Sequence, residues 1–158
     1  MRTLLIGIGN GSRGDDALGW LFLNEIEEKD PGRFDLEYRY QLQVEDADLI
    51  SKYERVLFVD ATEEHLPDGF IIKKCEPANS YYFSSHLQSP EAVLYLSRTL
   101  YPQTPEAFVI PIKGHKWELG EPLSPEASEH LEKALESFRV TGLYKQAQIE
   151  ETETEELF

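Results

Sequence analysis

The sequence predicts a three-layer α/β/α domain with a largely parallel central sheet of about five strands. Short, uninterrupted apolar runs, typical of buried parallel strands, alternate along the chain with segments of helical apolar spacing. At 158 residues, one such domain buries about two thirds of the surface of its unfolded chain. We place this domain at residues 1–140. Residues 141–158, with one lysine against five glutamates, are expected to form an acidic, disordered tail.

Apolar runs or alternating patterns, bounded by turn residues or charges, mark the expected strands. In chain order they cover residues 3–8, 34–40, 56–59, 69–72 and 107–110. The lysines at positions 73 and 74 place the fourth of these segments near an edge of the sheet.

The expected helices follow the strands and begin at about residues 15, 46, 90 and 125. Two of them have the same start signal, Ser-Pro-Glu, at residues 89–91 and 124–126. This signal combines an N-cap serine, a proline at the first helical position and an acid in the first turn. The last helix presents one apolar face, formed by Ala127, Leu131, Ala134, Leu135 and Phe138.

The chain is strongly acidic, with 30 Asp and Glu against 15 Lys and Arg and a formal net charge of −15. This charge disfavours nucleic acid and anionic membranes as partners. The single cysteine excludes an intramolecular disulfide, and the opening apolar run is too short for a signal peptide or a membrane span. We therefore expect a cytoplasmic protein, and a monomer.

Two adjacent aspartates, Asp15 and Asp16, follow a glycine-rich turn after the first strand and form the most informative segment of the chain. A dinucleotide fingerprint also begins with a strand and closely spaced glycines, but Ser12 occupies the position of its third glycine. Two ionised carboxylates would also repel a pyrophosphate, so we expect no nucleotide site. Capping of the helix would explain one of the two aspartates but not both, so the other is a candidate functional residue.

Two further polar residues follow strand-like segments: Asp60 ends the run at residues 56–59, and His86 follows the aromatic residues 81–83. Because ligands collect at the carboxyl ends of parallel strands, right-handed crossovers would bring Asp16, Asp60 and His86 to one rim. Two carboxylates and an imidazole suit a divalent cation such as nickel, zinc or cobalt. Taken alone, Asp60 also fits a turn cap at a strand end, and His86 a structural loop histidine.

Other side chains compete for these roles. His65, in a loop near Asp60, is the best substitute for the histidine ligand, ahead of His115 in a turn and His130 on the polar side of the last helix. Cys75 is interpreted as a structural or incidental thiol. The chain contains no H-E-x-x-H pair, no G-x-S-x-G elbow and no cysteine-protease pattern.

Together these segments resemble the hydrogenase maturation proteases, endopeptidases that process the large subunit of nickel-iron hydrogenases. The similar segments are Leu5-Ile6-Gly7-Ile8-Gly9-Asn10 with Asp15-Asp16 and Gly19, then Val59-Asp60-Ala61, Ser84-Ser85-His86 and the late Gly120-x-x-Leu123-Ser124-Pro125. The first segment is the most specific. The resemblance covers about residues 1–138 and leaves the acidic tail unmatched.

The resemblance implies that Asp16, Asp60 and His86 are metal ligands and form the catalytic site, with Asp15 as a neighbour. It further implies that the metal is nickel already inserted into the large-subunit precursor, from which the enzyme removes a C-terminal extension. Another divalent cation could occupy the site in vitro.

The chain departs from the family pattern at Ala17, in a short interval between the second and third motifs, and at residues 113–117. These departures bear on the choice of substrate more than on the fold. Two other functions stay open on the residues alone: a non-catalytic metallochaperone or partner-binding maturation factor, and a conventional zinc hydrolase that holds its own metal.

Overall fold

Five strands form one mixed sheet, described here in a computed structural model for residues 2–79 and 89–147. Four of them match the expected segments, but the expected strand at residues 69–72 contributes only an isolated bridge from Phe70 to Ile112, and the fourth strand is formed by the two lysines that follow it. The strand order is β2-β1-β3-β5-β4. All neighbouring strands are parallel except β4, which is a short antiparallel edge strand on β5. The bounds are β1 Thr3–Ile8, β2 Asp35–Arg39, β3 Arg55–Thr62, β4 Lys73–Lys74 and β5 Glu106–Lys113.

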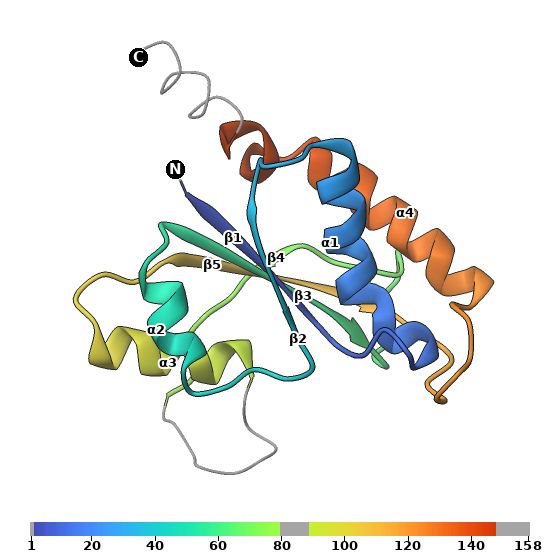
Figure 1. Cartoon of the computed structure of the whole chain (residues 1–158), viewed down its shortest axis with the longest axis horizontal. Coiled ribbons are helices and arrows are strands. Elements are labelled where there is room, and N and C mark those ends of the chain that lie inside the picture. Colours follow the sequence, from blue (N-terminus) through green and yellow to red (C-terminus); the bar gives the residue numbers. More distant parts are fainter. Residues whose placement is uncertain (1, 80–88, 148–158) are drawn as a thin grey trace.

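Helices cover both faces of this sheet, as the sequence predicts (Figure 1). The helices α1 and α4 lie on one face, and α2 and α3 lie on the other. A short 3-10 helix, η1, precedes α1. The bounds are η1 Gly14–Ala17, α1 Leu18–Lys29, α2 Asp46–Ser51, α3 Pro90–Leu100 and α4 Pro125–Arg139.

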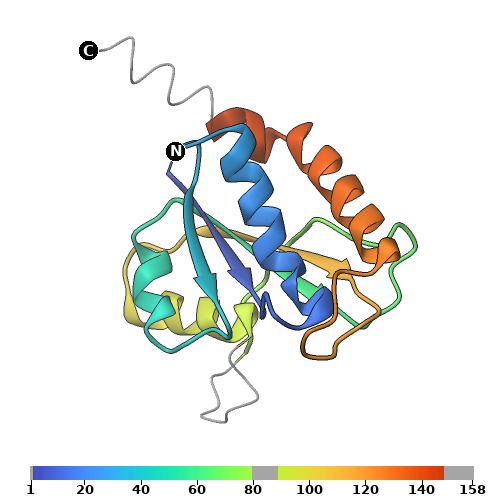
Figure 2. The ribbon, with the colours of Figure 1, turned by 45° about the vertical axis from the view of Figure 1, so that its right-hand side comes forward.

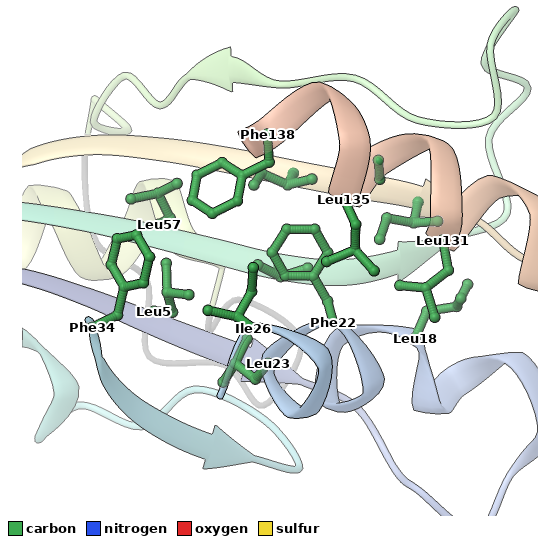
Figure 3. Close-up of a cluster of buried hydrophobic side chains, with 14 of the residues drawn as sticks. Leu5, Leu18, Phe22, Leu23, Ile26, Phe34, Leu57, Leu131, Leu135 and Phe138 are labelled. Carbon is green, nitrogen blue, oxygen red and sulfur yellow. The ribbon is translucent and has the colours of Figure 1, made fainter. Parts of the chain in front are cut away.

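The hydrophobic core is divided by the sheet into two clusters, because successive side chains of a strand point to opposite faces. Leu5 and Leu57 pack with α1 and α4, whereas their neighbours Leu4 and Val56 pack with α2 and α3. Figure 3 shows the first cluster, where side chains from α1 and α4 meet over the strands. The buried residues of α4 are those of its expected apolar face: Ala127, Leu131, Ala134, Leu135 and Phe138.

The start signals of α3 and α4 act as the sequence predicts. The Ser89 side chain accepts a hydrogen bond from the Ala92 N–H, and the Ser124 side chain accepts one from the Ala127 N–H, both at 3.1 Å. A proline follows each serine at the start of the helix. Each cap satisfies a backbone donor that the helix itself leaves without a partner.

The structured domain extends beyond the expected boundary at residue 140. Residues 142–147 are helical, and Tyr144 and Ala147 are buried in the same core cluster as α1 and α4. The Arg33 guanidinium lies 4.0 Å from the centre of the Tyr144 ring. The sequence did not predict these two core residues, because the acidic composition of residues 141–158 indicated a disordered tail. Residues 148–158 lie outside the described part of the chain.

The first turn of α1 packs directly against the sheet because residue 19 is glycine. A Cβ atom at Gly19 would lie 2.4 Å from the Val59 carbonyl oxygen and 2.7 Å from the Ile8 carbonyl oxygen. Gly7 faces it, and a Cβ there would lie 2.7 Å from the Gly19 carbonyl oxygen. The two glycines therefore allow the helix to start at the boundary between β1 and β3.

None of the helices formed by residues 2–79 and 89–147 combines the length and hydropathy needed to cross a lipid bilayer.

Gly19→Ala is expected to lower the free energy of unfolding by about 2 to 3 kcal/mol, because the new methyl group overlaps two backbone oxygens that cannot easily move. Gly142→Ala is the matched control, since its nearest neighbours would be 3.9 Å away in the Gln146 side chain. The control should stay within about 1 kcal/mol of wild type. Urea denaturation followed by circular dichroism measures both, and equal values would contradict the packing argument.

Candidate active site

Asp16 and Asp60 lie at the carboxyl end of the sheet, where the chain changes direction across it. From β1 the chain passes to β2 on one side and then to β3 on the other, so a topological switch point lies between β1 and β3. Asp16 follows β1 within η1, and Asp60 pairs in register with Ile8 at the end of β1. Ligands of open α/β sheets bind at such points.

Asp60 is a partly buried residue on the third strand, β3. Burial raises its pKa to about 7, and the nearby charge of Asp16 adds to this rise. The Ala61 backbone N–H donates a hydrogen bond to the Asp60 carboxylate at 2.8 Å, and this bond lowers the pKa by a smaller amount. The group is thus partly protonated near neutral pH, unlike an ordinary aspartate.

Asp16 is only partly buried, and its pKa is also raised by burial, against the lowering effects of Arg13 and of the Asn10 backbone N–H. The turn that carries it is held by main-chain hydrogen bonds from Asn10 to the Asp16 carbonyl and from Asp16 to the Arg13 carbonyl. Gly9, at φ 146°, permits this turn, because a Cβ there would lie 2.0 Å from the Asp16 carbonyl oxygen. Two carboxyl groups with raised pKa values therefore lie at the same rim, near enough for the charge of Asp16 to act on Asp60.

Asp15 has a structural role that the sequence did not reveal. Its side chain is fully buried and does not cap its own helix. Instead, its carboxylate accepts four hydrogen bonds, from the backbone N–H groups of His115, Lys116 and Ser124 and from the Ser124 hydroxyl, at 2.6 to 3.0 Å. Burial alone would raise its pKa, but these hydrogen bonds outweigh that effect and lower it. Asp15 joins η1 to the loop before α4.

A pocket of about 210 Å³ lies beside Asp60. Its floor includes Phe58 and Val109, and the start of α3 contributes Pro90 to its wall. The charged side chains around it are Asp60, Glu64, Lys73 and Glu91. The pocket is open, polar and mostly acidic, so it suits a cation or a peptide segment held next to the Asp60 carboxyl group.

His86, the third expected ligand, lies outside the described residues, as does the aromatic stretch at 81–83 before it. The expected meeting of all three ligands therefore stays a prediction. Within residues 2–79 and 89–147, no three His, Cys, Asp or Glu side chains are grouped as a metal site. His65 is exposed, and His130 contacts the Lys113 carbonyl oxygen at 3.0 Å. Burial raises the pKa of the Cys75 thiol to about 12, which fits a structural thiol.

Asp60→Asn should stabilise the metal-free protein at alkaline pH. The pKa of Asp60 is about 7 in the folded chain and 3.8 as its ordinary value, so the free energy of unfolding of the wild-type protein falls as the pH rises between these values. Asparagine resembles the neutral form of aspartate and does not ionise, so the variant lacks this loss of stability. The gain in free energy of unfolding should be about 1 to 2 kcal/mol larger at pH 8 than at pH 5.5. Urea denaturation with a chelator tests this, and an equal gain at both values would contradict the raised pKa.

Asp15→Asn should destabilise the protein by about 3 kcal/mol or more at pH 7, because an NH₂ group replaces one of the two acceptor oxygens that face four donors, two of them buried. Asp16→Asn, one residue away, should stay within about 1 kcal/mol of wild type, since its carboxylate gains little from being charged. Chemical denaturation of the two variants side by side provides the measurement. Similar losses for both would contradict the structural role of Asp15.

No protein-family model and no curated protein sequence matches the chain. Solved structures, however, show the same fold as this chain. The fold is similar to the crystal structure of the [NiFe] hydrogenase maturation protease HycI from Thermococcus kodakarensis KOD1, at 27% sequence identity and a TM-score of 0.66. That match covers 87% of this chain and 89% of the other.

Two further structures share the fold. The hydrogenase maturating endopeptidase HybD from E. coli is 21% identical with a TM-score of 0.64, over 87% of this chain and 90% of the other. HybD from T. kodakarensis is 23% identical with a TM-score of 0.61, and the match covers 88% of this chain and 97% of the other. The N-terminal motif, the switch-point carboxylates and this shared architecture agree, and the chain resembles the hydrogenase maturation proteases in sequence motif and in fold.

Proposed function

We propose that this protein is an endopeptidase that removes a C-terminal extension from the nickel-loaded large-subunit precursor of a nickel-iron hydrogenase. The observation that carries the proposal is the pair formed by Asp16 and Asp60 at the switch point of the sheet, beside an open acidic pocket. The similarity to structures described as hydrogenase maturation proteases supports the reaction class.

Recognition would operate through the nickel ion that the precursor brings. Asp16 and Asp60 supply oxygen ligands, and His86 supplies a nitrogen, a donor set that suits nickel. His86 stands four positions before Pro90 in the sequence, and Pro90 lines the same pocket as Asp60. An unloaded precursor lacks the ion and would not be held, which makes cleavage conditional on nickel insertion.

Catalysis would depend chiefly on positioning the scissile peptide in the pocket beside Asp60. Asp60, with a pKa of about 7, can accept a proton from water and return it near neutral pH. A cation bound to the same carboxylates would favour their charged forms and polarise the water or the scissile carbonyl group. The acidic surface would favour a basic precursor.

Asp16→Asn, Asp60→Asn and His86→Ala should each reduce cleavage of the nickel-loaded precursor by about a hundredfold or more, because each removes a ligand of the bound ion. The mass loss of the precursor, followed by mass spectrometry, is the measurement. Full processing by the Asp60→Asn, His86→Ala double variant would refute the site.

His65→Ala is the matched control for the histidine, since His65 is exposed in a loop that follows β3. This variant should cleave the precursor as wild type does. Binding of the loaded precursor without any mass loss would instead indicate a maturation factor that is not an enzyme. Cleavage that depends on a tightly bound zinc ion in the purified protein would indicate a conventional zinc hydrolase.

A further inference from the structure

An exposed aromatic cluster lies at the same rim of the sheet as Asp16. It consists of Trp20, Tyr38 and Tyr40, which we call the aromatic patch. The Trp20 ring lies 5.8 Å from the Tyr38 ring and 5.3 Å from the Tyr40 ring, measured between centroids. Tyr40 is 72% exposed and Tyr38 is 38% exposed. A group of large rings at the surface needs an explanation, because single exposed apolar residues are common but clusters mark contact sites.

Two of the three rings of the aromatic patch, Trp20 and Tyr38, are anchored by hydrogen bonds. The Trp20 indole N–H donates to the Arg39 carbonyl at 3.1 Å, and the Tyr38 hydroxyl donates to the Asn24 side chain at 2.6 Å. Rings fixed in this way lose little conformational entropy when a partner covers them. This preorganisation is typical of residues that contribute most to binding.

The patch is continuous with the candidate active site. A Cβ atom at Gly11 would lie 3.1 Å from the Trp20 ring, so the turn that carries Asp16 rests against the indole. The Gly9 N–H donates to the Arg39 carbonyl at 2.9 Å and joins this turn to the end of β2. Figure 2 shows the carboxyl ends of β1 and β2 and the start of α1 along one edge of the molecule. A substrate that reaches Asp16 would pass beside the patch.

Charge specifies the kind of partner. The chain has a net charge of −15, and Glu27 lies close enough to Tyr38 to influence its hydroxyl electrostatically. Arg39, the cation next to the patch, is already paired with Glu37 and Asp46 at 3.0 and 3.1 Å. Aromatic faces in a negative surface attract guanidinium and ammonium groups together with apolar side chains.

The bonding of Arg39 also opposes a second binding mode, in which a peptide would pair with the outer edge of β2. Its guanidinium donates to the Tyr38 carbonyl at 3.0 Å, so this backbone acceptor is already occupied. A charged side chain bonded to an edge strand is a common protection against strand addition. Contact through the rings is therefore the favoured mode.

We infer that the aromatic patch is the docking surface for the hydrogenase precursor, and that it binds a segment carrying arginine or lysine beside apolar side chains. The inference rests on the proposed function for the identity of the partner. It adds a second contact, separate from the carboxylates, that holds the precursor while its scissile peptide is at the rim.

Tyr40→Ser should raise the Kd for the nickel-loaded precursor by about tenfold or more, as expected for a central aromatic contact. Tyr40→Phe should stay within about threefold of wild type, because the ring is retained. Val140→Ser is the matched control, since Val140 is 69% exposed but follows α4 at the opposite end of the sheet. It should bind as wild type does. Immobilised precursor and biolayer interferometry give the Kd values, and thermal denaturation checks that each variant is folded.

The outcomes separate the two claims. Wild-type binding that is lost in Tyr40→Ser, but without any cleavage of the precursor, would overturn the proposed function and leave the docking surface standing. Cleavage by wild type with equal Kd values for wild type, Tyr40→Ser and the Tyr38→Ser, Tyr40→Ser double variant would overturn the docking surface alone. Absence of precursor binding by wild type would overturn both.

Discussion

The close approach of α1 to the sheet is the constraint on which the rest of the structure depends. Gly19 brings the first turn of the helix against the Ile8 and Val59 carbonyl oxygens, and no larger residue fits there. Because the helix starts at this point, η1 must turn sharply over the ends of β1 and β3. That turn carries Asp16 to the vicinity of Asp60, which a longer helix–sheet separation would prevent.

The second consequence of this packing is that two adjacent aspartates have opposite roles. η1 lies between the sheet and the loop before α4, so Asp15 points into the protein and Asp16 lies nearer to solvent. Asp15 meets four donors and is stabilised as a carboxylate. Burial raises the pKa of Asp16, and the charge of Asp16 in turn helps to raise the pKa of Asp60. One aspartate therefore fixes the loops around the site, and the other remains available for a ligand.

The charged form of Asp60 is disfavoured in the folded protein, because the carboxyl group is removed from solvent and lies near the charge of Asp16. Such an arrangement opposes folding at neutral pH and is relieved when a cation binds or a proton is held. The aromatic patch beside it has no such cost, since it contains no charged group and two of its rings, Trp20 and Tyr38, donate ordinary hydrogen bonds. The proposed binding of a metal-loaded precursor rests on this combination of a charged centre with aromatic rings beside it.

The sequence by itself determined the fold class, four of the five strands, the positions of the helices with the serine caps of α3 and α4, and the importance of the segment that carries Asp15 and Asp16. These features depend on local periodicity and on turn and cap residues, which are determined by residues close together in the sequence. The tertiary structure alone decided which aspartate is structural, that Tyr144 belongs to the core, and that Trp20 and Tyr40 meet. The physical reason is that hydrogen bonds, burial and ring contacts of these side chains join residues far apart in the chain, and no local pattern specifies such partners.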